Sequence, residues 1–286
     1  MQSNNPVFNR SEGFNGRGTT TAARSNDPSQ WHIDLNQQQG TGYAPIGLDD
    51  RMTIDSVVQK TGMTLGLVIA TAAVAWVAIG QLVTEEGLTN PNAFRTAAAL
   101  AMGGAIVGLV LSLVNSFKRV ISPALVLAYA VAEGAFVGAF SKIVASFVGD
   151  TAIVAQAVVG TMVAFGANLA AYKFFNIRVT DKFRKVVTMA TLAVVGVLLV
   201  NLVLSLTGVF ETGGLRGWDT LGLVVSIALV GLAIFNLILD FDYVERGVEA
   251  GLPERESWRA AFGLTVTLVW LYIELLRIIA ILRSGD

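Results

Sequence analysis

The sequence predicts an all-α membrane protein, with seven transmembrane helices that follow a polar N-terminal tail. Apolar residues make up 53% of the chain and charged residues 14%, whereas soluble domains have about 45–50% and about 25%. The apolar residues lie in runs of about twenty, the helix length that crosses a hydrocarbon core about 30 Å thick. Because backbone donors find no water in lipid, each run must form a helix.

The apolar runs are rich in Leu, Val, Ala, Ile and Gly around the whole circumference of the predicted helix. A helix with one face in water would not tolerate that pattern. The predicted spans are 61–83, 95–115, 122–145, 152–174, 186–207, 219–241 and 259–282. Together they form one predicted transmembrane domain over residues 51–286.

Residues 1–50 have the opposite composition. They are rich in Asn, Gln, Ser, Gly and Arg and follow no helical or strand period. Such a segment cannot bury enough apolar surface to fold, so we predict a disordered cytoplasmic tail. It has no apolar stretch behind a basic start, and it is therefore not expected to be a secretory signal peptide.

The scarcity of reactive side chains limits the chemistry. The chain has no cysteine, and its one histidine, His32, lies in the tail, where we expect it to be solvated. Thiolate catalysis, zinc clusters and Ser–His or Cys–His arrangements are thus not expected in the membrane domain. A net charge of −1 favours no nucleic-acid partner. We expect no cofactor and no enzymatic activity. An intramembrane hydrolase is disfavoured because the membrane domain has no His or Cys and its carboxylates have no obvious partner that would activate water.

Lys and Arg concentrate in cytoplasmic loops, so their distribution predicts the orientation. With the N-terminus inside, the cytoplasmic segments carry Arg10, Arg17, Arg24, Arg51, Lys60, Lys118, Arg119, Lys173, Arg178, Lys182, Arg184, Lys185, Arg246, Arg255 and Arg259. The outer connections carry only Arg95, Lys142 and Arg216. We predict a multi-pass plasma-membrane protein with its N-terminus in the cytoplasm and its C-terminus outside.

Small residues recur at four-residue spacing within the spans. The pairs are Gly62 and Gly66, Gly104 and Gly108, and Gly134 and Gly138. This spacing lets neighbouring helix backbones approach closely. We interpret all three pairs as helix contacts rather than as hinges or gates.

Charged residues inside the spans carry the functional information, because each costs at least ~2.5–3.5 kcal/mol near the bilayer centre. Glu133 lies in the middle of span three. Asp240 lies near the inner end of span six, with Asn236 one turn earlier on the same face. Glu274 lies well inside span seven, and Arg277 follows it by one turn.

Two interpretations of these charges stay open. In the first, Glu274 and Arg277 form an ion pair within one helix, while Asp240 and Asp242 lie among lipid headgroups. In the second, spans six and seven are neighbours because one connection joins them, so Asp240 and Glu274 face each other. Such carboxylates would share a proton at low pH and release it as the pH rises. Ionised, they would bind calcium weakly and transiently, because calcium prefers about 6–8 oxygens.

Three short motifs resemble the transmembrane Bax inhibitor-1 motif family, most closely its bacterial branch, over roughly residues 55–283. They are Glu133–Gly134, the sequence LDFDYV at 239–244 and the sequence LYIELLRII at 271–279. The tail has no expected counterpart in this core. The resemblance implies a seven-helix fold with a central last helix, and a pH-sensitive calcium leak governed by a carboxylate dyad. By motif position, the dyad falls on Asp240 and Glu274.

Two features depart from the family pattern. The connection between spans six and seven is longer, so the carboxylates would meet only if span six continued past Asp240 toward Val248, or if the connection folded back. Arg277 stands where the family more usually has a neutral polar residue. As a fixed cation it would favour ionised Glu274 and repel calcium.

The sequence therefore supports a hypothesis and a rival. The first is a calcium or other cation leak channel gated by Asp240 and Glu274, with Arg277, Asn236 and Glu133 in support. The rival is a non-conducting membrane regulator of a protease or a stress response. It would bind a membrane-protein partner through the tail or the 242–258 connection. In both, the lipid bilayer is the constant partner.

Overall fold

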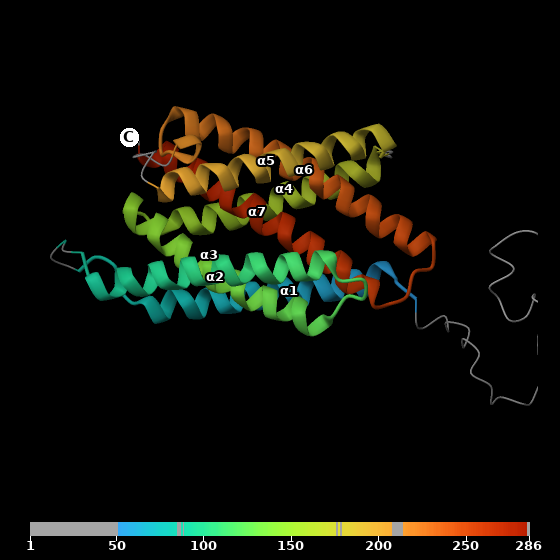
Figure 1. Ribbon diagram of the computed structural model, residues 1–286, viewed down its shortest axis with the longest axis horizontal. Helices are drawn as coiled ribbons and strands as arrows, with labels where there is room; N and C mark the ends of the chain where they lie inside the picture. Colours follow the sequence, from blue (N-terminus) through green and yellow to red (C-terminus); the bar gives the residue numbers. More distant parts are fainter. Residues whose placement is uncertain are drawn as a thin grey trace, which may run out of the picture. The chain divides into compact units, whose positions relative to one another are not determined.

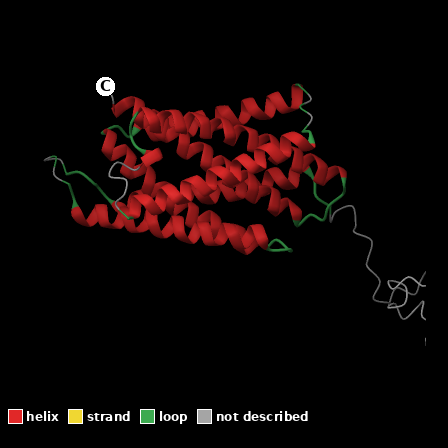
Figure 2. Cartoon of the chain, turned by 45° about the horizontal axis from the view of Figure 1, so that its top comes forward, coloured by secondary structure: helices red, strands yellow, loops and turns green. Residues whose placement is uncertain are grey.

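The computed structural model describes residues 51–84, 87, 89–175, 177, 179–207 and 214–284, so the predicted disordered tail lies outside the described residues. The helices are α1 (Ile54–Ile79), α2 (Pro91–Phe117), α3 (Pro123–Val148), α4 (Ala152–Phe174), α5 (Asp181–Leu206), the short 3-10 helix η4 (Gly214–Arg216), α6 (Thr220–Glu249) and α7 (Glu256–Ser284). Helices and loops account for the described chain (Figure 2). Seven of the helices are long and apolar enough to cross a membrane, which confirms the predicted fold class.

The helices begin at capping residues rather than at the first apolar residue. Thr53 and Ser56 cap α1 reciprocally, each side chain bonding the other's backbone N–H. Asp219 caps α6 by accepting from the Gly222 N–H at 2.8 Å. The other end of α6 extends to Glu249, beyond the predicted end at 241. Apolar runs mark only the part of a helix that suits lipid, and polar turns extend it further.

The last helix is the central one. In Figure 1, α7 runs between a group formed by α1, α2 and α3 and a group formed by α4, α5 and α6. It contacts α1, α3, α4 and α6. Of the apolar membrane-spanning stretch of α7, 67% is buried inside the protein, whereas the buried share of the other six spans ranges from 12% to 44%. The central position implied by the family resemblance is therefore confirmed.

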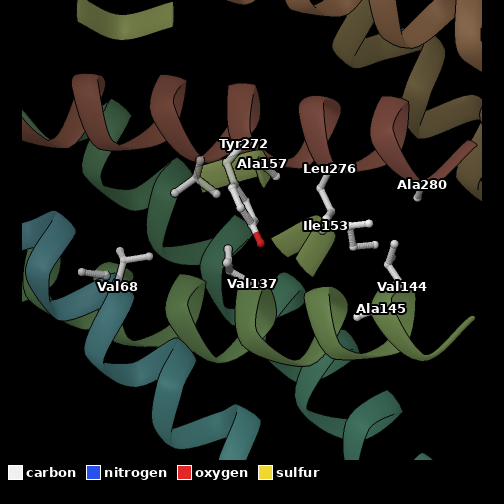
Figure 3. Packing of buried hydrophobic residues seen from close by; sticks show 11 residues of the cluster. Val68, Val137, Val144, Ala145, Ile153, Ala157, Tyr272, Leu276 and Ala280 are labelled. Carbon is white, nitrogen blue, oxygen red and sulfur yellow. The ribbon is translucent and has the colours of Figure 1, made fainter. Parts of the chain in front are cut away.

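The core beside α7 joins four helices. Figure 3 shows Tyr272 pointing from α7 toward Val137 of α3, with Leu276 and Ile153 further along the same cluster. The Tyr272 hydroxyl lies 2.7 Å from the Ser141 hydroxyl of α3, so a polar bond crosses this apolar layer. Such a bond satisfies both hydroxyl groups where no water is present.

Close helix packing uses two of the three predicted glycine pairs. A Cβ at Gly104 of α2 would lie 2.8 Å from the carbonyl oxygen of Ala132 in α3. A Cβ at Gly138 of α3 would lie 2.8 Å from Cα of Ala72 in α1. At Gly62 and Gly66 a Cβ would meet nothing within 4 Å, so the prediction of a helix contact there is wrong. Four-residue spacing marks a possible contact face, and only the packing decides which faces are used.

We expect Gly138→Ala to destabilise the protein by about 1–3 kcal/mol, because the added methyl group would press on the backbone of α1, which cannot rotate aside. The control Gly66→Ala adds the same methyl group in open space and should leave stability unchanged or slightly higher. Thermal unfolding in detergent measures both. Equal midpoints for the two variants would contradict the close α1–α3 contact.

Candidate functional site

Helix α7 connects the two ends of the bundle. At the end where α1 begins, here called the α1 end, the Ser257 hydroxyl lies 2.6 Å from that of Ser56. At the opposite end, here called the far end, Arg283 donates to Asp150 at 2.9 Å. Polar side chains surround α7 at two levels between these points. One level contains Asp240, and the other contains Glu274.

Asp240 of α6 lies against the first half of α7. The Thr267 hydroxyl donates to Asp240 Oδ2 at 2.7 Å. A cavity of about 290 Å³, here called the Asp240 pocket, adjoins the carboxylate, and its lining includes Asn115 and Arg259. Asn115 is 1% exposed. Its Nδ2 donates to the Leu125 carbonyl at 3.2 Å, while its Oδ1 has no partner within the described part of the chain.

Glu274 is enclosed by protein, with an exposure of 2%. Its Oε1 accepts from Nη1 of Arg216 at 2.5 Å, and Arg216 belongs to η4 in the connection between α5 and α6. Its Oε2 is buried and has no partner among the residues that the structure covers. A charge-assisted bond in such surroundings is strong, but it depends on a loop residue remaining in place.

Arg277 holds that connection against α7. Its Nη2 donates to the carbonyl oxygens of Arg216 at 3.1 Å and Gly217 at 3.0 Å, and its Nε donates to the Ser226 hydroxyl at 3.3 Å. The guanidinium also lies 4.9 Å from the ring centre of Trp218. We refer to Glu274, Arg216 and Arg277 together as the Glu274 cluster.

The structure does not bring Asp240 and Glu274 together. Helix α6 does continue past Asp240, to Glu249. Asp240 nevertheless meets α7 at Thr267, seven residues before Glu274, which corresponds to ~10.5 Å along the helix axis. The interpretation with an ion pair inside α7 is also wrong, because Glu274 pairs with Arg216 instead of Arg277. Asp242 is 6% exposed and bonded to two arginines, so it does not lie free among headgroups.

The two other predicted residues face different helices. Asn236 donates to the Thr191 hydroxyl of α5 at 2.9 Å, so it joins α6 to α5 rather than to α7. Glu133 interacts with the Tyr129 hydroxyl one turn earlier in α3, and a Cβ built at Gly108 of α2 would lie 2.8 Å from its Oε2. The Tyr129 ring packs edge-on against Phe262, which lines the Asp240 pocket.

Sequence reasoning missed Arg216, Thr267 and Asn115 as site residues. Thr267 precedes Glu274 by two helical turns, and that spacing could have placed it on the same face of α7. The loop-charge pattern assigns Arg216 only to an outer connection. Nothing in the sequence indicates that this loop folds back onto a buried carboxylate.

Seven membrane-length helices that enclose carboxylates and arginines define a polytopic membrane protein with a charged interior, a feature that usually marks function. A family model described as Bax inhibitor 1 like matches residues 5–284, essentially the whole chain. The protein therefore belongs to the Bax inhibitor 1 like family. The match also includes most of the tail, so the expectation that the tail lies outside the family is wrong. No curated protein matches the sequence.

Proposed function

We propose that the protein is a slow, pH-dependent cation leak channel, closed by the ion pair between Glu274 and Arg216. The observation that carries the proposal is that a buried carboxylate on the central helix is neutralised by a residue of a connecting loop. Breaking this pair requires movement of the loop and of no spanning helix. A loop can move at much lower cost than a packed helix.

The sign of the pH dependence follows from the charges near Glu274. Arg216 faces it from η4, Arg277 lies one turn along α7, and Asp219 stands at the start of α6. Loss of the negative charge on Glu274 would remove its attraction for Arg216 and free the Arg216 side chain. The leak is therefore expected to be larger in acid than at neutral pH. This switch needs no proton shared between Asp240 and Glu274.

The Asp240 pocket supports the choice of a cation. Asp240 and Asn115 line it together with Arg259, and the Asn115 Oδ1 has no partner within the described residues. The described residues contain no group of three side chains suited to hold a metal ion. The Asp240 and Asn115 side chains offer at most three oxygens, short of the about 6–8 that calcium prefers, so calcium would bind weakly, as passage requires. We place the protein in the plasma membrane. With the orientation proposed from the loop charges, this pocket then faces the cytoplasm.

Purified protein in liposomes loaded with a calcium dye tests the proposal. Wild type should leak more as the external pH falls. Glu274→Gln, which mimics the protonated group, should leak at every pH, whereas Asp240→Asn should leak less than wild type. Asp150→Asn, a carboxylate paired with Arg283 at the far end, is the control and should behave as wild type. Wild-type flux no greater than that of empty liposomes at any pH would overturn the channel.

The rival, a non-conducting regulator of a protease or stress response, stays a proposal. Its docking surface is smaller than the tail and the 242–258 connection together. Most of residues 242–258 belongs to α6 and α7. The remaining turn is held to α1 by the Lys60–Glu254 ion pair at 2.5 Å, and to the segment before α1 by the bond from Met52 N to Leu252 O at 2.7 Å. Docking would thus fall to the tail. Removing residues 1–50 should then change the set of membrane proteins recovered in a pull-down, and an unchanged set would argue against it.

A further inference from the structure

A second cavity lies at the α1 end, between the start of α5 and the end of α6, and the proposed channel does not use it. Its volume is about 350 Å³, and its lining includes Arg184 and Thr188 of α5 and Asp242, Tyr243 and Arg246 of α6. We refer to it as the Arg184 cavity. Within the described chain, α5 contacts only α6 and η4, so this side of the bundle faces outward.

Asp242 fixes both arginines at this cavity. Its Oδ2 accepts from Arg184 Nη2 at 2.6 Å and its Oδ1 from Arg246 Nε at 3.0 Å. Arg246 Nη2 also donates to the Val179 carbonyl at 3.2 Å. Arg184 Nε and Nη1 and Arg246 Nη1 donate to no acceptor in the part of the chain that the structure describes. Arg184, Arg246 and Asp242 together therefore carry one net positive charge, and the arginines keep donors that point in fixed directions. The side chains of Arg184 and Arg246 are 40% and 51% exposed.

We propose that the Arg184 cavity binds the phosphate group of an anionic phospholipid. A guanidinium held in place by a carboxylate presents paired donors that match phosphate oxygens. Exposed Lys182 and Lys185 add positive charge in the first turn of α5, partly offset by Asp181. Basic pockets between spanning helices near the membrane surface suit such headgroups.

The apolar surface beside the cavity favours a lipid over a soluble phosphate. Leu192 and Val195 of α5 are 67% and 46% exposed, and they lie two to three turns beyond Arg184 on the side of the helix that carries Arg184 and Thr188. They lie on a helix long and apolar enough to cross the membrane. Acyl chains can therefore lie along α5 while the phosphate reaches the arginines. Glu245, the nearby carboxylate on α6, accepts from the Tyr172 hydroxyl at 2.5 Å, so it has a partner of its own.

The test is a lipid titration of the full chain in neutral detergent, followed by thermal unfolding. Short-chain phosphatidylglycerol should raise the unfolding midpoint to a plateau, and phosphatidylcholine with the same chains should not. Arg184→Gln should weaken the effect about tenfold or more, because it removes a charged donor. Arg184→Lys should restore only part of it. Thr188→Trp, which fills the cavity and leaves the Asp242 bonds intact, provides an independent block if Arg184→Gln fails to fold.

The matched control is Arg283→Gln, which removes an arginine of similar exposure, 46%, from an ion pair at the far end. It should leave the titration unchanged. Equal stabilisation by phosphatidylcholine, or an equal loss in Arg283→Gln, would overturn the proposal. Inorganic phosphate or glycerol phosphate producing the full effect would also overturn it, because the ligand would then be a soluble phosphate.

Discussion

Arg216→Gln is expected to raise the cation leak at neutral pH about tenfold or more, to the level that wild type reaches only in acid. Arg216 is the ion-pair partner of Glu274, and its side chain is 23% exposed. Removing one partner of a buried pair costs about 3–5 kcal/mol. Loss of even about 1.4 kcal/mol from the closed state alone raises the open population about tenfold. Dye-loaded liposomes at a series of pH values measure the change.

The double variant Arg216→Gln/Glu274→Gln separates a gate from a general loss of packing. If the two residues act only through their shared bond, the double variant should leak no more than Glu274→Gln alone. Arg283→Gln, which breaks a far-end pair outside the Glu274 cluster, should leave the leak unchanged. An Arg216→Gln variant that stays closed at neutral pH would eliminate this gate.

Arg277→Met is expected to cause the largest loss of stability, about 3–5 kcal/mol, since it removes a buried charge bonded to three acceptors. Arg277 is 4% exposed. Its loss would leave two carbonyl groups of the connection without a hydrogen-bond donor and would leave fewer positive charges near Glu274. Thermal unfolding in detergent should show a midpoint far below that of wild type. Proteolysis should cut the α5–α6 connection sooner.

Arg277→Lys should rescue little, because an ammonium group cannot reach two carbonyls and cover the Trp218 ring in the same geometry. Arg283→Met changes a more exposed arginine, six residues further along α7, and should cost only about 0–1 kcal/mol. A fully stable Arg277→Lys variant would refute the role of the planar guanidinium in holding the connection.

The spans and the family could be predicted from sequence, because both depend on local signals. Length and apolarity alone mark a segment that lipid forces into a helix, and the seven spans follow from that. The motifs around Glu133, Asp240 and Glu274 supported the family resemblance that the whole-chain match confirms. The cost of a buried charge also identified Glu274 and Arg277 as enclosed side chains, at 2% and 4% exposure.

Only the tertiary structure decided the partners of these charges. Whether Asp240 reaches Thr267 or Glu274 depends on the axial offset between α6 and α7, which loop length does not specify. The pairing of Glu274 with Arg216 depends on a connection folding back into the bundle. Likewise Gly138 is in contact and Gly66 is not, although both follow the same spacing. Hydropathy reports how each residue interacts with its solvent, whereas pairing depends on the relative position of helices distant in sequence, and packing alone determines that position.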